Sequence, residues 1–371
     1  MKVAVCAGEE SGDALGHELL IDLKKNNKDI EFIGVGGSLM ESAGLQSFFP
    51  IADISYMGLI DPLINLKKIL NIRKDFINFL KTENPDVFIG IDSPSFNSGI
   101  CKALRKETNI KTVQYVCPQF WAWRYGRVYR FNSLYHKIFS LFPFESKLLK
   151  KHNVNFSYMG HPLAKNLPSN HDEITLRKDL NIPLNKEVIA ILPGSRKSEI
   201  KHHDKPLADF INKYKKYNPD TEIILALNKE SDLTGELKEL SKTIRVTFNT
   251  TQKVLAICDL AVIASGTATL EAAILAKPMV VIYKSNSLSN FILSNFFLKT
   301  EFISLPNILS QEKIVFELRQ NQVSGKEISE KVELTFKNQE VIAKKLSLIR
   351  DSLLVKDSNK FSIALKEILA K

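Results

Sequence analysis

Residues 259–284, DLAVIASGTATLEAAILAKPMVVIYK, contain the signals that decide the fold. The short apolar run 260–264 predicts a buried strand of a parallel sheet. Residues 268–276 are rich in Ala and Leu and predict a helix, and residues 279–283, just after Pro278, predict a second buried strand. The stretch therefore reads as a β-turn-α-β unit, the repeating element of an open α/β sheet.

The turn inside this unit, Ser265-Gly266-Thr267, predicts an anion site. The start of a helix leaves backbone N–H groups without intrahelical partners, and the helix dipole favours a phosphate there. Glu271 lies one turn into the helix and is not explained by a capping box, because the third residue after Thr267 is Leu270. A carboxylate at 271 could bond two hydroxyls of a ribose. The alternative is that Glu271 is a surface residue whose carboxylate interacts favourably with the helix dipole.

The composition indicates a soluble globular protein that is long enough for two domains. The chain has 371 residues, of which 44% are apolar and 25% are charged. It has no run of eighteen apolar residues, and its first eight residues lack the features of a signal peptide. Four scattered cysteines predict reduced thiols in a cytoplasmic protein. The formal net charge of +10 favours an anionic partner, such as nucleic acid, an acidic membrane or a phosphorylated substrate.

Strand and helix signals alternate along the chain and predict an α/β fold with doubly wound parallel sheets. In the first half, strands are expected over 2–7, 31–35, 86–91, 112–116 and 137–141, a loop over 9–13, and helices over 14–25 and 62–82. In the second half, strands are expected over 188–192, 222–227, 245–248, 260–264 and 279–283, with a helix near 200–214. Two such Rossmann-like halves would face a cleft, with ligands at the carboxyl ends of the strands.

The domain boundary is expected in the polar, proline-containing stretch 153–172. The predicted division is an N-terminal domain over 1–168, on the acceptor and membrane side, and a donor-side domain over 169–340. The charged helical segment 341–371 is expected to pack back on the N-terminal domain.

A second anion-receptive turn follows the first strand of the second half. The sequence Pro193-Gly194-Ser195-Arg196 lies between a strand and a helix. Arg196 could form two bonds to a diphosphate, although an ion pair with a surface acid is the alternative. Two such turns in one domain favour the functional interpretation.

Common nucleotide and metal motifs do not fit the sequence. The loop after the first strand is too short for a P-loop and lacks its lysine, and the glycines at 34, 36 and 37 lack the third glycine of a dinucleotide fingerprint. No two aspartates are two residues apart, so no Asp-x-Asp motif could hold a metal on a nucleotide diphosphate. The negative charge of a departing diphosphate would then be met by helix starts and cationic side chains.

Two motifs of the first half are expected at the same sheet edge. Asp92 follows a buried strand and could act as a general base on a hydroxyl, although an ordinary Asp-Ser-Pro turn is the alternative. Glu9 and Ser11 lie in the acidic loop AGEESGD, residues 7–13, after the first strand. They are candidate catalytic residues, and a solvated loop with Asp13 as the helix cap is the alternative.

A segment rich in aromatic and arginine residues, 115–130, contains both tryptophans of the chain. Trp123 and Arg124 are candidates for the acceptor side, because Arg124 and Arg127 share a helical face that could bind phosphate. Interleaved aromatics and arginines could also stack single-stranded bases, or form a core plug. Basic residues are spread over the whole chain rather than gathered in one stripe, so nucleic acid is not the expected partner.

Motifs along almost the whole chain resemble the lipid-A-disaccharide synthase family. They are AGEESGD (7–13), GVGG (34–37), YMGL (56–59), PDVFIGIDSP (85–94), WAWR (121–124), PFE (143–145), GHPLA (160–164), LPGSR (192–196), ASGTATLEAA (264–273) and SLPN (304–307). The resemblance implies an inverting glycosyltransferase with two Rossmann domains, the GT-B type. We expect no cofactor, and the two anion-receptive turns and the missing Asp-x-Asp motif predict that no metal is required.

The resemblance also implies a reaction. UDP-2,3-diacylglucosamine would donate its sugar to the 6-hydroxyl of 2,3-diacylglucosamine 1-phosphate, giving UDP and a β-1,6 disaccharide 1-phosphate. Asp92 would be the base. The UDP-sugar site would comprise Gly194, Ser195, Arg196, Gly266, Thr267, Thr269, Glu271 and Asn307. Another UDP-sugar enzyme of this fold, such as an epimerase or a UDP-N-acetylglucosamine transferase, is the alternative.

The sequence departs from the family's pattern at three places. A second aspartate is usual three residues after the first, but here that residue is Ser95, so Asp92 must act alone. Gln119-Phe120 replaces Ser-Val before the Trp-Ala-Trp motif, and Lys165 replaces an aspartate.

Both implied substrates carry acyl chains, so we expect a cytoplasmic protein associated peripherally with the inner leaflet of the inner membrane. The candidate docking element is the predicted helix 62–80, in which Ile64, Ile72 and Phe79 fall outside the main apolar stripe and basic residues lie close by. A crossover helix packed on the sheet is the alternative, and residues 291–298 are a second candidate. The sequence leaves the oligomeric state open, with a homodimer as one possibility.

Overall fold

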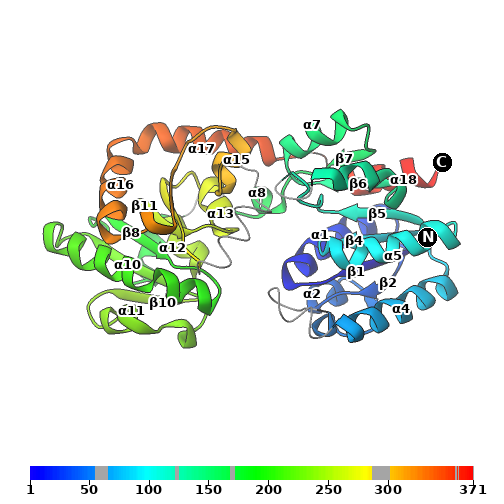
Figure 1. Ribbon diagram of the computed structural model, residues 1–371, viewed down its shortest axis with the longest axis horizontal. Coiled ribbons are helices and arrows are strands. Elements are labelled where there is room, and N and C mark those ends of the chain that lie inside the picture. The colour runs from blue at the N-terminus through cyan, green and yellow to red at the C-terminus, as the bar shows by residue number, and fades with distance from the viewer. Residues whose placement is uncertain are drawn as a thin grey trace. The chain divides into compact units, whose positions relative to one another are not determined.

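The computed structural model describes residues 1–54, 66–121, 125–167, 172–285, 301–355, 357 and 359–370 (Figure 1). The chain folds into two compact units, the first formed by Met1–Pro162 with Val355–Lys371 and the second by Leu163–Leu354. The boundary expected at 168/169 thus falls at 162/163. Segment 341–371 was expected to pack on the N-terminal domain, but helix α17 (Gln339–Leu353), which contains its first part, groups with the second unit.

Among its described residues, the first unit has a sheet of seven parallel strands in the order β3-β2-β1-β4-β5-β6-β7. The strands are β1 (Lys2–Ala7), β2 (Glu31–Val35), β3 (Leu45–Ser47), β4 (Val87–Ile91), β5 (Lys111–Tyr115), β6 (Lys137–Ser140) and β7 (Phe156–Tyr158). Its helices are α1 (Glu10–Asn26), α2 (Ser38–Ser42), α4 (Leu66–Glu83), α5 (Pro94–Glu107), α6 (Phe131–Leu134), α7 (Pro143–Lys151) and α18 (Lys360–Leu369), with 3₁₀ turns η1 (Ile51–Asp53) and η2 (Tyr125–Arg130). Helix α8 (Pro162–Asn166) begins at the boundary.

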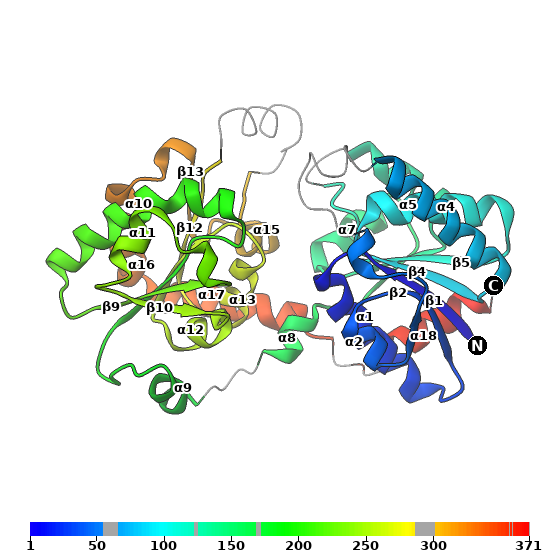
Figure 2. The same cartoon turned by 90° about the horizontal axis from the view of Figure 1, so that it is seen from below.

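Successive strand residues point to opposite faces of this sheet and enter two apolar layers. Val3 and Val5 pack with residues of α1 and α18, whereas Ala4 and Cys6 pack with residues of α4 and α5. Figure 2 shows α4 and α5 on one face of the sheet and α1, α2 and α18 on the other. The near-continuous apolar runs of the central strands are therefore explained by burial on both faces.

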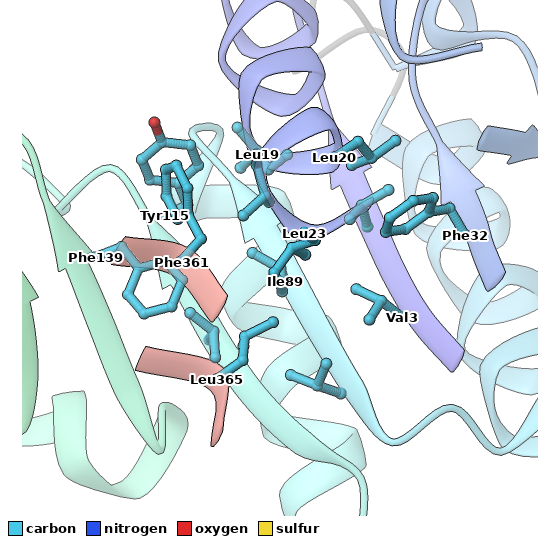
Figure 3. Packing of buried hydrophobic residues seen from close by; sticks show 14 of the residues in the cluster. Val3, Leu19, Leu20, Leu23, Phe32, Ile89, Tyr115, Phe139, Phe361 and Leu365 are labelled. Atoms are coloured by element: carbon cyan, nitrogen blue, oxygen red, sulfur yellow. The ribbon is translucent and has the colours of Figure 1, made fainter. Parts of the chain in front are cut away.

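Helix α18 supplies part of the first unit's core from the far end of the chain. The Phe361 ring lies 5.2 Å from that of Tyr115 and 5.8 Å from that of Phe139, and Leu365 is buried in the same layer (Figure 3). Lys360 Nζ also donates to the carbonyl of Met159 at 2.6 Å. Helix α18 is thus part of the hydrophobic core of the first unit.

The second unit is built on six parallel strands in the order β10-β9-β8-β11-β12-β13. The strands are β8 (Val188–Leu192), β9 (Glu222–Leu227), β10 (Arg245–Phe248), β11 (Leu260–Ala264), β12 (Met279–Tyr283) and β13 (Phe316–Arg319). Its helices are α9 (Glu173–Asp179), α10 (Lys197–Tyr217), α11 (Gly235–Leu240), α12 (Thr251–Ile257), α13 (Ala268–Ile274), α15 (Leu305–Ser310), α16 (Gly325–Lys337) and α17, with 3₁₀ turns η3 (Glu230–Asp232) and η5 (Gln320–Gln322). Residues of α10 and α16 form an apolar layer with β8, β9, β11 and β12.

Several predicted boundaries were wrong. The edge strands β3, β7 and β13 were not predicted, because they are three or four residues long and carry no continuous apolar run. The stretch 153–172, interpreted as a linker, contains β7 and α8. Helix α1 begins at Glu10 rather than at residue 14, so residues 10–13 belong to its first turn.

Within the described ranges, no helix combines the length and the apolar character that crossing a membrane requires. The sequence motif YMGL and the apolar segment 291–298 lie outside the described residues.

Candidate functional site

Each sheet has one point at which the strand order reverses direction, and Asp92 and the two predicted anion-receptive turns lie at these points. In the first unit this switch lies between β1 and β4, and in the second between β8 and β11. Open parallel sheets bind ligands in the crevice at the carboxyl ends of such strands. Asp92 follows β4 directly, and the turns at 193–196 and 265–267 follow β8 and β11.

Asp92 lies in a strained turn between β4 and α5. Its φ is 50° and that of Ser93 is 39°, both in the left-handed region that residues with a Cβ avoid. The backbone N–H of Asp92 donates to the carbonyl of Tyr115 at 2.9 Å, which fixes the turn against the end of β5. Strain of this kind is typical of functional sites.

The ionisation of Asp92 suits the role of a base. Burial raises the pKa of this carboxyl above its ordinary value, and a hydrogen bond from the Ser93 backbone N–H offsets part of the rise. A more basic carboxylate accepts a proton more readily. Its environment therefore supports proton abstraction once the group is ionised.

The loop after β1 lies against this turn. A Cβ on Gly8 would be 2.2 Å from the Ser93 hydroxyl oxygen, so only glycine allows this close approach. Glu9 and Ser11 are exposed at the start of α1. The suggestion that Asp13 caps α1 was wrong, because its buried carboxylate accepts backbone N–H groups of Gly37, Leu39 and Met40 at 2.8–3.1 Å, at the start of α2.

The second unit contains a cavity of about 790 Å³ at its switch point. Every predicted donor-site residue except Thr269 and Asn307 lines it. The lining comprises Leu192, Gly194, Ser195, Arg196, Glu199, Ala226, Asn228, Asn249, Thr250, Thr251, Gln252, Lys253, Ile263, Ala264, Ser265, Gly266, Thr267, Ala268 and Glu271. Its size lies within the range usual for small-molecule sites.

Two helix starts meet at this cavity. Backbone N–H groups from Thr269 to Glu271 are bonded within the first turn of α13, so those of residues 266–268 are the ones that helix geometry leaves open. At the other start, Gly194 has a φ of 127°, and the Glu199 carboxylate accepts the Ser195 N–H at 3.3 Å. Arg196 is largely exposed and lies 3.6 Å from Glu199. The arrangement provides N–H donors, a helix dipole and a guanidinium to an anion.

Glu271 contributes a carboxylate to the lining of the cavity. Burial raises the pKa of its carboxyl, and the Gln252 amide, which donates to Oε1 at 3.0 Å, offsets part of the rise. Gln252 and the other residues of the polar stretch 249–253 were not predicted as site residues. Their position directly after β10, in the connection to α12 and its first turn at the carboxyl edge of the sheet, is the sequence signal that could have identified them.

Thr269 and Asn307 are not among the described residues that line the cavity, and their side chains bond to other protein groups. The Thr269 hydroxyl donates to the Gly266 carbonyl at 2.7 Å. The Asn307 amide donates to Val315 O and Glu317, and its oxygen accepts the N–H groups of Ile314 and Val315. Asn307 is fully buried, so all its hydrogen-bonding capacity is used inside the protein.

A buried histidine connects the two sides of the second unit's site. His203 on α10 bonds through Nδ1 to the Pro193 carbonyl at 2.7 Å, and its Nε2 accepts the Lys284 N–H at 3.1 Å. Burial lowers the pKa of this imidazole, which favours the neutral ring that this bonding pattern requires. His203 thereby links the turn after β8 to the residue that follows β12.

Of the four residues predicted on the acceptor and lipid sides, the structure describes Ile72. Ile64, Trp123 and Arg124 lie outside the described residues. Ile72 was placed on the lipid side, but it packs against the core of the first unit together with Phe79, whose ring stacks 4.3 Å from that of Phe48. The periodicity had assigned these residues to the wrong face of the helix.

Within the described part of the chain, no three His, Cys, Asp or Glu side chains are grouped so that they could hold a metal ion. The expectation that the reaction requires no metal stays a prediction that an experiment must test.

Solved structures with the same fold belong to UDP-sugar enzymes and glycosyltransferases. A UDP-GlcNAc 2-epimerase from Neisseria meningitidis, bound to UDP-GlcNAc, superposes with a TM-score of 0.66 at 13% identity and covers 100% of both chains. The glycotransferase of kitacinnamycin superposes with a TM-score of 0.64 at 14% identity, over 99% of this chain and 98% of that one. The fold is therefore the GT-B type, with two Rossmann-like domains.

Sequence comparison narrows this class to one family. The model of the Lipid-A-disaccharide synthetase family matches residues 3–370. The lipid-A-disaccharide synthase of Colwellia psychrerythraea (strain 34H) is 37% identical over 334 residues, which are 88% of this chain and 84% of that protein. That of Acinetobacter baylyi is 34% identical over 353 residues, covering 91% and 89%. The chain belongs to the Lipid-A-disaccharide synthetase family, whose members are glycosyltransferases that form the lipid A disaccharide.

Proposed function

We propose that the second unit binds UDP-2,3-diacylglucosamine as donor and that the first unit supplies the base for the acceptor, 2,3-diacylglucosamine 1-phosphate. The observation that carries the proposal is the cavity of the second unit, where two helix starts, Arg196 and the Glu271 carboxylate line one space. The helix starts and Arg196 suit a diphosphate, and a carboxylate suits the two hydroxyls of a ribose. The UDP-sugar enzymes that share the fold support this choice.

The proposed reaction is a single displacement. The Asp92 carboxylate takes the proton of the acceptor's 6-hydroxyl, and the oxygen attacks the anomeric carbon of the donor sugar as the bond to the diphosphate breaks. UDP leaves with the electron pair of that bond, and its charge is met by Arg196 and the N–H groups at the start of α13. The product is the β-1,6 disaccharide 1-phosphate, with inversion at the anomeric carbon.

UDP release with and without the acceptor tests this proposal. A transferase releases UDP only when 2,3-diacylglucosamine 1-phosphate is present, because the leaving group departs as the acceptor attacks. Equal UDP release without the acceptor, or conversion of the donor into an isomer, would favour a hydrolase or an epimerase instead.

The reaction is expected to proceed without a divalent metal. The cavity already supplies N–H donors and a guanidinium to the diphosphate, so a chelator such as EDTA should leave the rate of UDP release unchanged within about twofold. A rate that disappears with EDTA and returns on addition of magnesium would contradict this expectation. Dialysis of the protein against EDTA before the assay provides the control for tightly bound metal.

The acyl chains of both substrates place the reaction at a lipid surface, and we propose that the protein acts at the cytoplasmic face of the inner membrane. Helix α4 exposes Leu66 and Leu70, with relative exposures of 50% and 42%, and Lys67 and Lys74 are exposed as well. These positions recur at i, i+1, i+4 and i+8, so they share one side of the helix. This exposed side of α4 combines apolar and basic residues, as interfacial helices do.

The variant Leu66→Ser/Leu70→Ser/Lys67→Glu/Lys74→Glu should bind anionic vesicles much more weakly than the wild type. Each basic residue near such a surface contributes about 1 kcal/mol, and this attraction is screened by salt. Activity on short-chain substrate dispersed in detergent should be retained. The variant Ile363→Ser/Lys366→Glu, at exposed positions of α18, is the matched control and should sediment like the wild type. Full sedimentation of the α4 variant at low salt would exclude this helix as the docking element.

A further inference from the structure

The strained turn at Asp92 continues into the neighbouring strand end. Val116, directly after β5, has a φ of 72°, which is unusual for a β-branched residue. Its N–H donates to the Phe139 carbonyl at 3.0 Å, and the Asp92 N–H donates to the Tyr115 carbonyl. Two adjacent strands therefore end in left-handed conformations, and such conformations persist only where the surroundings enforce them.

Two buried amide side chains hold the carbonyl of Asp92. Gln114, on β5, donates through Nε2 to the Asp92 carbonyl at 2.9 Å and also lies 3.2 Å from Tyr115 O. Asn97, on α5, donates through Nδ2 to the same Asp92 carbonyl at 3.0 Å. Both side chains have a relative exposure of 0%. The N–H and the C=O of Asp92 are thus both fixed, the latter by two donors.

Burying a polar side chain at each of these two positions costs free energy. Gln114 and Asn97 are both fully buried, and burying an amide is unfavourable unless it is hydrogen-bonded. Their oxygens, Gln114 Oε1 and Asn97 Oδ1, have no hydrogen-bond partner among the described residues. The hydrogen bonds of these two amides are therefore made by their N–H groups, which accounts for a glutamine at 114 and an asparagine at 97. Gly90 makes room for this arrangement, since a Cβ at 90 would lie 2.7 Å from the Cβ of Asn97.

We infer that Gln114 and Asn97 are positioning residues that keep Asp92 in its left-handed conformation and thereby aim its carboxylate at the acceptor hydroxyl. The inference rests on the proposed role of Asp92 as the base. Neither amide is proposed to contact substrate. Both act through the backbone of Asp92, so they should affect turnover and leave the donor site in the second unit unchanged.

The variant Gln114→Met keeps the length of the side chain and removes its donors. Its kcat should fall about 10- to 100-fold, because a small misplacement of a catalytic group costs up to about 10²-fold in rate. The KM for the donor and the Kd for UDP should stay within about twofold of the wild type. Gln46→Met, an exposed substitution on β3, is the matched control and should be indistinguishable from the wild type.

A rescue experiment separates positioning from packing. Glycine adopts a positive φ without the steric cost of a Cβ, so Ser93→Gly should stabilise the turn without the help of Gln114. Ser93→Gly alone should have near-normal activity, and Ser93→Gly/Gln114→Met should recover at least about half of the lost kcat on a logarithmic scale. A defect caused only by poor packing at position 114 would not respond to a change at position 93.

If Gln114→Met does not fold, as judged by UDP binding and circular dichroism, Gln114→Glu serves in its place. A glutamic acid at 114 donates to the Asp92 carbonyl while it is protonated and loses that donor when it ionises. Its activity should therefore fall with rising pH relative to the wild type. The inference is overturned if Asp92→Asn is inactive while Gln114→Met keeps full kcat, or if Gln114→Glu has the pH profile of the wild type. Full activity of Asp92→Asn would instead overturn the proposed base.

Discussion

Asp92→Asn is expected to lose at least about 10²-fold in turnover while it binds UDP as tightly as the wild type does. The amide cannot accept the proton of the acceptor hydroxyl, and general-base catalysis contributes about 10²–10⁴ in rate. The described residues that line the donor cavity all belong to the second unit, and Asp92 is not one of them. Steady-state kcat with both substrates, together with UDP affinity from calorimetry, measures the two quantities.

The matched control is Asp29→Asn, an exposed aspartate in the loop between α1 and β2, which should leave turnover unchanged. The wild-type rate should fall as pH decreases through the pKa of Asp92, because only the ionised carboxylate is a base. Burial raises that pKa, so the fall should begin at a higher pH than for an exposed aspartate. Near-normal turnover in Asp92→Asn would exclude this carboxylate as the base.

Arg196→Ala is expected to weaken UDP binding by about 10- to 100-fold. A hydrogen bond to a charged group contributes about 1.5–3 kcal/mol, and 1.4 kcal/mol corresponds to a factor of ten in affinity. The guanidinium lies at the cavity and its nearest acid, Glu199, is 3.6 Å away, so it is available to a more strongly charged diphosphate. Titration of UDP into the purified variant measures the loss.

Lys197→Ala removes the adjacent exposed cation, which does not line the cavity, and is the control for net charge. Arg196→Lys should fall between the wild type and the alanine variant, since an ammonium cannot form the two parallel bonds of a guanidinium. A UDP affinity in Arg196→Ala equal to that in Lys197→Ala would show that Arg196 does not bind the diphosphate.

The central strands of both sheets could be predicted from the sequence because they are buried on both faces and read as short apolar runs. β8, β9, β11 and β12 occur over the residues expected for them. The edge strand β10 was predicted, whereas β3 and β7 were missed because they have only three residues and are held by pairing with β2 and β6 rather than by their own apolar pattern. The side of α4 that faces the core was also missed, since Leu66 and Leu70 fit the apolar stripe and yet are exposed.

The candidate site could be predicted where a residue type and a turn occur together. Gly194, Arg196 and Glu271 were found because each lies at or just after a strand-to-helix turn. Gln252 was missed because its place at the cavity and its bond to Glu271, a contact 19 residues away in sequence, come from the fold rather than from a local motif. Asn307 was placed among the donor-binding residues by resemblance, whereas its amide is used to hold residues 314–317.

The proposed transfer is best tested by mass spectrometry of the products that the purified protein forms from UDP-2,3-diacylglucosamine and 2,3-diacylglucosamine 1-phosphate. We expect UDP and a tetraacylated disaccharide 1-phosphate in equal amounts, with neither product formed when the acceptor is omitted. A donor that is isomerised or hydrolysed without formation of a disaccharide, at the same rate with and without the acceptor, would contradict it.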